Sequence, residues 1–188
     1  MDEKKKVVWI IDGAYMRKAS PDAFDWLKLK HVLEGPGGAS FYEVYYLDTI
    51  ASPPTEGQEK FITWLKCAPP DGPKFRVQLY SLKNLHVTCP KCGHPFDRTV
   101  QKGVDVGIAT LIIKLATQNK YERLLLSAGD GDFEDAISYV KSELHKEIYL
   151  AVFRGSVSAD LQSYADKVCW LDEYRELFKK PAATERIG

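Results

Sequence analysis

Short apolar runs alternate along the chain with longer segments in which apolar residues recur at helical spacing. The runs at residues 7–11, 41–47 and 124–126 contain few polar side chains. Such runs are typical of strands that are buried on both faces of a parallel sheet. Residues 105–118 instead place Val, Ile, Leu and Ala three and four positions apart, which predicts a helix with an apolar face.

The same periodicities extend over the rest of the chain. We predict strands at residues 7–11, 41–47, 75–82, 124–126, 148–153 and 168–171, and helices at residues 24–33, 58–66, 105–118, 132–140, 158–164 and 172–179. This alternation favours an α/β fold, a three-layer sandwich on a mainly parallel, Rossmann-like sheet. Because residues 75–82 mix apolar and polar side chains, that strand is expected near a sheet edge. We expect residues 1–180 to form one domain with an insert at residues 86–103, and residues 181–188 to form a disordered tail.

Acidic residues crowd the turn that follows the fourth predicted strand. Asp130 and Asp132 flank a single glycine there, and Asp135 follows within the next helix. In the simplest interpretation Asp130 caps that helix and Asp132 complements its dipole. Two carboxylates this close repel each other unless they share a cation, so the turn also suggests a metal site.

The end of the first predicted strand carries a matching acid, Asp12. If the first and fourth strands are neighbours where the strand order reverses, Asp12 and Asp130 meet across one crevice. Asp105 opens the preceding helix and is able to reach the same place. Ligation by oxygen atoms alone selects hard cations such as Mg²⁺ or Mn²⁺, whose usual substrates are phosphate esters.

Composition limits the partners that the chain can attract. Among 188 residues, 26 basic and 26 acidic side chains give a net charge of zero, so a polyanion must be held by a local basic patch or a bound metal.

No apolar run reaches membrane-spanning length, and the N-terminus leads directly into a strand-like segment. We therefore expect a cytoplasmic protein with no signal peptide and no membrane partner, and four cysteines that are free or metal-bound rather than paired.

Three blocks of the sequence together resemble the NYN domain. They are Ile10-Ile-Asp-Gly-Ala-Tyr-Met16, Lys102-Gly-Val-Asp-Val-Gly-Ile-Ala109 and Leu126-Ser-Ala-Gly-Asp-Gly-Asp-Phe133. Ser158-Ala-Asp-Leu161 with Ala165-Asp166 resembles the closing motif of the LabA-like branch of this PIN-like nuclease superfamily. The blocks occur in family order over about 160 residues, so the resemblance covers nearly the whole chain.

This resemblance implies a metal-dependent ribonuclease on a PIN-like sheet. Asp12, Asp105 and Asp130 would be the central catalytic and metal-binding carboxylates, with Asp132 supporting them and Ser127 orienting them. Mg²⁺ or Mn²⁺ would activate a water for in-line attack on an RNA phosphodiester and stabilise the leaving oxygen.

Two positions depart from the family pattern. Tyr15 stands where the first motif usually has asparagine, and Leu111 stands where the second motif often has a further aspartate. These departures concern the number of metal ions and the way in which the substrate is held.

Several residues outside the acidic blocks are candidates for binding phosphate. Lys102 is the strongest, because it lies three residues before Asp105. Ser156 and Ser158 could present a helix N-terminus to a phosphate, although as plain helix caps they need no further role. Other cations predicted in loops or at strand ends are Arg17, Lys18, Lys91, Arg98 and Arg154.

The insert contains Thr88-Cys-Pro-Lys-Cys-Gly-His94, which has the form of a zinc knuckle. Cys89 and Cys92 supply only half of a tetrahedral site. His86, His94 or Cys67 could complete it, as could the same knuckle of a second copy in a homo-oligomer. A loop that binds nothing is the alternative, and similar inserts precede the Lys-Gly-x-Asp motif in LabA-like chains.

Two other functions remain open on the sequence. Gly129-Asp-Gly-Asp-Phe-Glu134 approaches a motif of haloacid-dehalogenase-like phosphatases, with Asp12 as nucleophile. That enzyme class needs a general acid at the position of Ala14 and has no place for Asp105. A catalytically weak RNA-binding module on the same fold is the second alternative, suggested by Tyr15 and Leu111.

Overall fold

A computed structural model describes residues 5–35, 40–100 and 103–180. Its centre is a six-stranded sheet in the order β3-β2-β1-β6-β7-β8, and every neighbouring pair in that sheet is parallel. The predicted tail at residues 181–188 and the predicted site residue Lys102 lie outside the described ranges.

The order of the elements along the chain follows the predicted alternation. The strands are β1 (Val7–Asp12), β2 (Glu43–Ile50), β3 (Arg76–Ser81), β4 (Lys83–Thr88), β5 (Pro95–Val100), β6 (Arg123–Ser127), β7 (Glu147–Val152) and β8 (Lys167–Trp170). The α-helices are α1 (Gly13–Ala19), α2 (Trp26–Glu34), α3 (Glu56–Lys66), α4 (Val104–Thr117), α5 (Glu134–Ser142), α6 (Ala159–Ser163) and α7 (Arg175–Phe178). Two short 3₁₀ turns, η1 (Gly131–Phe133) and η2 (Leu171–Tyr174), precede α5 and α7.

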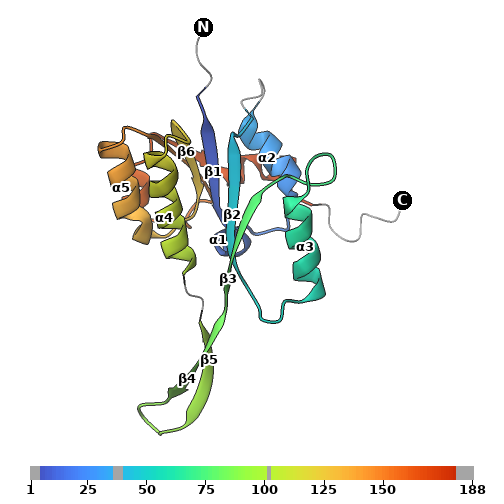
Figure 1. The fold of residues 1–188 in the computed structure, drawn as a ribbon, viewed down its shortest axis with the longest axis vertical. Coiled ribbons are helices and arrows are strands. Elements are labelled where there is room, and N and C mark those ends of the chain that lie inside the picture. Colours follow the sequence, from blue (N-terminus) through green and yellow to red (C-terminus); the bar gives the residue numbers. More distant parts are fainter. Residues whose placement is uncertain (1–4, 36–39, 101–102, 181–188) are drawn as a thin grey trace.

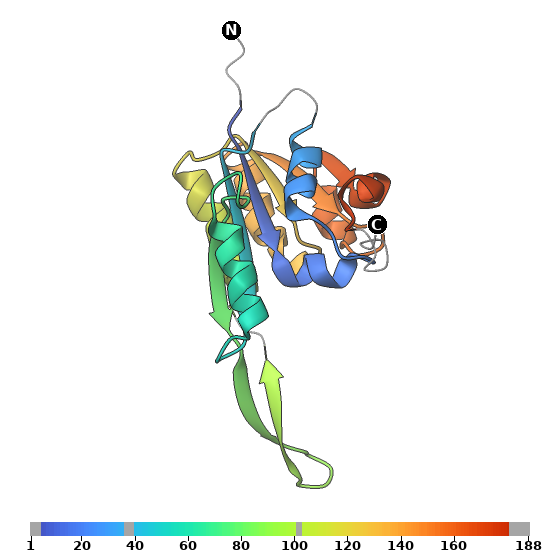
Figure 2. The same ribbon diagram turned by 90° about the vertical axis from the view of Figure 1, so that its right-hand side faces the viewer.

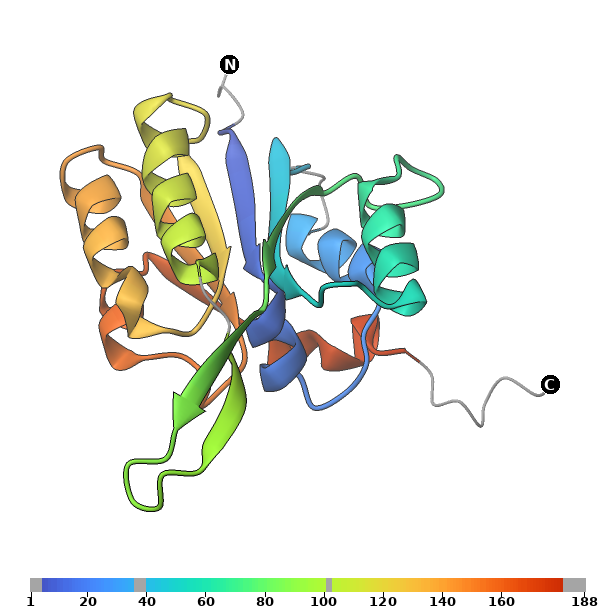
Figure 3. The ribbon, with the colours of Figure 1, turned by 60° about the horizontal axis from the view of Figure 1, so that its bottom comes forward.

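Helices cover both faces of the sheet, so the predicted three-layer α/β sandwich is confirmed (Figures 1 and 3). On one face, α4, α5 and α6 pack over β1, β6 and β7 in one hydrophobic cluster. On the other face, α1, α2, α3 and α7 contribute to a second cluster. The sheet therefore lies between two separate hydrophobic layers.

The two central strands show why the apolar runs predicted burial on both faces. In β1, Val8 and Ile10 belong to the first cluster, whereas Trp9 and Ile11 belong to the second. All four side chains are fully buried. Successive side chains of a strand point to opposite faces, so a continuous apolar run is what a sheet covered on both sides requires.

The structure differs from the predicted elements in three places. A seven-residue helix, α1, begins directly after β1 and was not predicted. The insert forms a two-stranded antiparallel hairpin, β4–β5, which projects from the body of the molecule (Figure 2). The predicted terminal helix is divided into the η2 turn and a single helical turn, α7.

The position of β3 agrees with its mixed pattern, because it is the edge strand on one side of the sheet. The chain passes from β3 directly into the hairpin and returns to begin α4 (Figure 1). Over the described residues, no helix has both the length and the apolar character that crossing a bilayer requires.

Candidate active site

The strand order reverses between β1 and β6, which lie side by side at the centre of the sheet. Ile11 is paired in register with Ser127, so the segments that follow both strands leave from the same edge. The condition for Asp12 and Asp130 to meet across one crevice, that these two strands are neighbours, is therefore met. In open parallel sheets, this reversal point is where a crevice forms outside the carboxyl ends of the strands.

A cleft of about 670 Å³ lies at this reversal point. Three of the predicted acids, Asp12, Asp105 and Asp130, line it from three separate segments of the chain. The rest of the lining comes from α1, from the loop after β6 and from the loop after β7: Ala14, Tyr15, Lys18, Ala19, Gly129, Gly155 and Ser156. The cleft thus combines carboxylates with one lysine and several small residues.

Asp12 ends β1 and begins α1. Its Oδ1 atom accepts a hydrogen bond from the backbone N–H of Tyr15 at 3.0 Å, which caps the helix. The half-buried Asp12 is thereby held at the floor of the cleft. The local signal for α1 was an aspartate followed four residues later by the apolar Met16, which is fully buried.

Tyr15 ties α1 to the loop after β7. Its hydroxyl is 2.7 Å from the Ser156 Oγ atom and accepts the backbone N–H of Phe153 at 3.1 Å. Gly129 lies against this contact, because an added Cβ there would be 2.0 Å from the backbone oxygen of Ser156. Tyr15 therefore fixes one wall of the cleft.

The other two acids sit at helix starts. The Asp130 Oδ1 atom accepts the backbone N–H of Asp132 at 3.1 Å and caps η1. Asp105 lies exposed in the first turn of α4, where the helix dipole favours a negative charge. Asp132 is also exposed, but it does not belong to the lining of the cleft.

The acids of the cleft influence one another electrostatically. Burial raises the pKa of Asp12, and the negative charges of Asp105 and Asp48 raise it further. Hydrogen bonds from two backbone N–H groups lower this pKa but do not cancel the rise. Burial also raises the pKa of Asp105, together with the charges of Asp130 and Asp132. A raised carboxyl pKa means that the ionised form is disfavoured in the folded protein.

The chemistry of the acids that line the cleft suits a divalent cation. The donors are carboxylate oxygens, which suit Mg²⁺ or Mn²⁺. In the described part of the chain, neither Asp12, Asp105 nor Asp130 forms an ion pair with lysine or arginine. Among those same residues, no three His, Cys, Asp or Glu side chains are arranged so as to hold one metal ion. The donor chemistry therefore fits, while the acids surround the cleft without meeting at one point.

Two predicted supporting serines lie elsewhere. Ser127 is fully buried, and its Oγ atom accepts the indole N–H of Trp9 at 2.9 Å. Ser158 caps α6 by accepting the backbone N–H of Leu161 at 3.1 Å. The structure therefore does not bring Ser127 or Ser158 into the lining of the cleft, whereas Ser156 does belong to it.

Arg17 was predicted at the phosphate-binding rim, but the structure pairs it with a buried acid. Both guanidinium NH groups donate to the carboxylate of Asp48, one of them over 2.9 Å. Asp48 is only 4% exposed and also accepts the Tyr46 hydroxyl at 2.6 Å and the backbone N–H of Thr49 at 2.7 Å. Although Asp48 lies near the carboxyl end of β2, the strand next to β1, a cation within the chain already balances its charge.

The other predicted rim cations are divided. Lys18 is exposed and lines the cleft. Arg154 instead pairs with Glu173 and lies over the ring of Trp170, 4.7 Å from its centroid. Lys91 lies in the hairpin, outside the lining of the cleft. Within the described residues, Lys18 is therefore the one predicted cation that the structure places in the cleft.

Comparisons with known proteins agree with this architecture. A family model described as the NYN domain matches residues 6–172. A crystal structure of a protein of unknown function from Vibrio parahaemolyticus has a similar fold, with a TM-score of 0.65 and 20% sequence identity. The alignment covers 92% of this chain and 97% of that chain. A search of curated proteins found no match.

Proposed function

The chain belongs to the NYN domain family of the PIN-like nuclease superfamily, and we propose that it is a metal-dependent ribonuclease. The observation that carries this proposal is the cleft at the strand-order reversal, which Asp12, Asp105 and Asp130 line from three segments of the chain. Their mutual repulsion supports a role that the fold itself does not need, which is to hold a cation and a phosphate.

In this proposal Asp12, Asp105 and Asp130 hold Mg²⁺ or Mn²⁺, and Asp132 adds negative charge beside them. Bound there, such a cation would lower the pKa of a water molecule and neutralise charge that develops on the phosphodiester. Lys18 contacts the RNA backbone from the rim of the cleft. Tyr15 and Ser156 keep the opposite wall in place through their hydrogen bond.

The closing motif supports placing the chain in the LabA-like branch. Ser158 caps α6, and the backbone N–H of Ser158 donates to the Gly129 oxygen at 2.9 Å. Asp166 accepts the backbone N–H of Ile148 at 2.8 Å. In this assignment the motif is structural, because it joins the segments after β7 to the acidic loop and to the sheet.

The phosphatase alternative is not favoured by the family match. Ala14 lines the cleft at the position where that chemistry needs a general acid. An RNA-binding module without turnover differs from our proposal only in the outcome of a cleavage assay.

The test is cleavage of a fluorescent single-stranded RNA by the purified protein in Mn²⁺, in Mg²⁺ and in chelator. We expect cleavage that depends on the metal and that is lost in Asp130→Asn. Asp135→Asn is the matched control, because Asp135 is an exposed acid in the first turn of α5 that does not line the cleft. Equal losses in both variants, or RNA binding without cleavage under every condition, would contradict the proposal.

A further inference from the structure

The β4–β5 hairpin is a part of the molecule that the proposed nuclease site does not use. It forms a sheet of its own and projects away from the body, with the segment between its strands at the tip (Figures 1 and 2). Of the hairpin side chains that the structure describes, none belongs to either hydrophobic cluster. An isolated two-stranded hairpin is marginally stable in water, so this one needs another source of stability.

The tip is built as a knuckle around two cysteines. The backbone N–H of Cys89 donates to the His94 oxygen at 2.9 Å, and the N–H of Gly93 donates to the Cys89 oxygen at 2.9 Å. The turn thus holds both cysteines within one backbone loop that two hydrogen bonds close.

A glycine makes this turn possible. Gly93 has a φ of +69°, a conformation that other residues adopt only with strain. Both thiols are free, and Cys92 is exposed at the end of the arm. Two thiolates separated by two residues, followed by glycine, are half of a tetrahedral zinc site.

The remaining half is not supplied by the hairpin as it stands. The imidazole of His86 pairs with Asp97 on the facing strand. Over the described residues, no third Cys, His, Asp or Glu joins the two thiols in an arrangement able to hold a metal. Cys67 ends α3, where its thiol donates to the Thr63 oxygen at 3.3 Å, and so it belongs to the body of the molecule.

We propose that the hairpin tip is half of a four-thiolate zinc site, and that Cys89 and Cys92 of a second copy of the chain supply the other half. The projection of the arm lets two tips meet while the two bodies stay apart (Figure 2). Phe96, which is 46% exposed, lies opposite Val87 beside the tip and offers apolar surface for the contact. Metal binding then provides the stability that the hairpin lacks a core to provide.

The experiment measures metal content and mass together on the full chain, in a thiol reductant that prevents disulfide formation. With Zn²⁺ present, we expect one zinc per two chains and a mass twice the 21.3 kDa of the monomer by light scattering. A zinc chelator should return the protein to the monomer. Replacement by Co²⁺ should give the thiolate charge-transfer band of a site with four sulfur ligands.

Variants separate this assignment from its alternatives. Cys92→Ser should lose both zinc and dimer, whereas the matched Cys67→Ser should keep both. His86→Ala and His94→Ala should also keep both, because neither ring is a ligand in the proposed site. A monomer that binds one zinc per chain, a dimer that persists in chelator, or a reduced protein that binds no zinc would each overturn the proposal.

These outcomes are independent of the nuclease site. The hairpin thiols are absent from the lining of the acidic cleft, so RNA cleavage in Mn²⁺ by Cys92→Ser reports whether the body is folded. A Cys92→Ser variant that loses its zinc but retains the melting transition of the body would show that loss of metal is not a consequence of misfolding.

Discussion

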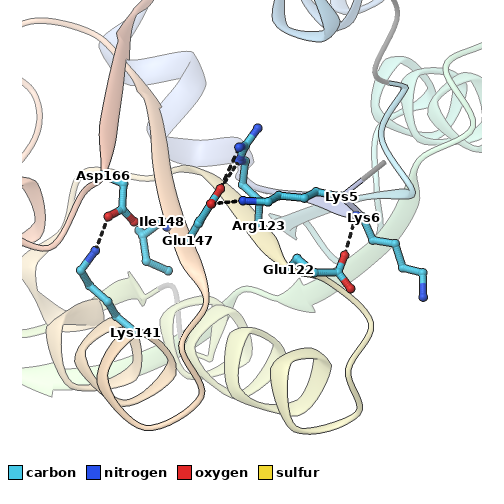
Figure 4. Close-up of polar contacts among 8 residues, drawn as sticks. All are labelled: Lys5, Lys6, Glu122, Arg123, Lys141, Glu147, Ile148 and Asp166. Atoms are coloured by element: carbon cyan, nitrogen blue, oxygen red, sulfur yellow. Dashed lines mark hydrogen bonds and ion pairs between the residues drawn. The ribbon is translucent and has the colours of Figure 1, made fainter. Parts of the chain in front are cut away.

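The two ends of the central sheet carry the same acidic residue types in opposite environments. At the amino ends of the strands, Glu147 accepts Lys5 and Arg123, the latter through its Nε atom at 2.8 Å (Figure 4). Nearby, Asp166 accepts the Lys141 ammonium at 2.7 Å. At the carboxyl ends, the acids of the cleft face other acids.

The pKa values follow this difference. The hydrogen bond from Lys5, aided by Arg123, lowers the pKa of Glu147. Although burial acts in the opposite direction on Asp166, the backbone N–H of Ile148 and the ammonium of Lys141 lower its pKa. In the cleft, burial and neighbouring charges raise the pKa values of Asp12 and Asp105. Acids at one end therefore stabilise the folded chain, whereas ionised acids at the other end destabilise it.

Asp48 shows that this contrast does not arise from position alone. It lies two residues before the end of β2, next to the strand that Asp12 ends, yet Arg17 and Tyr46 satisfy its carboxylate. Burial and the Asp48 charge raise the pKa of Tyr46, so the hydroxyl stays protonated and donates. An acid that is paired with a cation, such as Asp48, stabilises the fold. The acids of the cleft form no such pair in the described residues, so their carboxylates are available for a ligand.

The largest expected effect comes from replacing Asp12, an acid of the cleft, and Asp48, a balanced acid, each by asparagine in a separate variant. Asp12→Asn should lower metal-dependent RNA cleavage at least about a thousandfold, because about 4 kcal/mol of transition-state stabilisation depends on the cation. Asp48→Asn should keep cleavage within a few-fold but unfold more easily, by about 2 kcal/mol. Single-turnover cleavage and urea denaturation of both variants check this. Similar activity losses in both would remove the distinction between the two strand ends.

Removing the cation that balances Asp48 should have the next largest effect. Arg17→Ala leaves a carboxylate that is 4% exposed without its charge partner, so we expect a loss of about 2 to 3 kcal/mol in the free energy of unfolding. Lys18→Ala, an exposed cation of the same helix, should change that free energy by less than about 0.5 kcal/mol. Urea denaturation compares the two, and equal stabilities would show that Arg17 is not the balancing charge.

Tyr15→Phe tests the wall of the cleft. The variant loses the hydrogen bonds to Ser156 and to the backbone N–H of Phe153, and we expect about 1 kcal/mol less stability. Cleavage should fall several-fold through disorder of the wall rather than through loss of metal. The midpoint of the Mn²⁺ activation curve measures this, and a large shift in that midpoint would make Tyr15 part of the metal site instead.

The smallest effect is on the pH dependence of stability. The difference in stability between variant and wild type should have opposite signs for acids at the two ends of the sheet. Glu147→Gln should lower stability at pH 7 by less than about 1 kcal/mol, because its ion pairs are partly exposed. A lowered folded-state pKa gives stability that is present above the ordinary value of 4.5 and is lost as pH falls through the folded pKa. The difference between Glu147→Gln and wild type should therefore close below about pH 4.5.

Asp105→Asn should behave in the opposite way when no metal is present. Its folded-state pKa is raised from 3.8, so proton binding stabilises the native chain, and this contribution is lost as pH rises through the folded pKa. The variant should be more stable than wild type at pH 7 and equal to it near pH 3.8. Thermal melts from pH 3 to pH 7 in chelator check both variants, and differences of the same sign would refute the contrast.

The layers of the fold and the edge of the sheet where the candidate cleft lies were predictable because they depend on local patterns. Continuous apolar runs in β1 and β6 predicted strands buried on both faces, and the acids after them predicted the edge where the candidate cleft lies. That β1 and β6 are neighbours was a condition of this reasoning, and the pairing of the two strands in the sheet supplies it.

What could not be predicted depends on partners that are distant in sequence. Arg17 looked like a free cation because Asp48, its partner, lies 31 residues away on another strand. Ser127 follows the apolar run of β6. Because side chains alternate along a strand, Ser127 points to the face of the sheet opposite to that of Leu126, where it contacts Trp9. The helix α1 has only seven residues, too few for a clear periodic pattern.

The central claim is that the acids of the cleft repel one another until a divalent cation binds. The most direct measurement is a pair of thermal melts at pH 7, in chelator and in millimolar Mn²⁺, on wild type and on Asp105→Asn. Wild type should gain stability with Mn²⁺, about 1.4 kcal/mol at tenfold over the dissociation constant. Asp105→Asn should melt above wild type in chelator and respond weakly to Mn²⁺. If Asp105→Asn gains as much from Mn²⁺ as wild type does, Asp105 is not part of a metal site and the account is wrong.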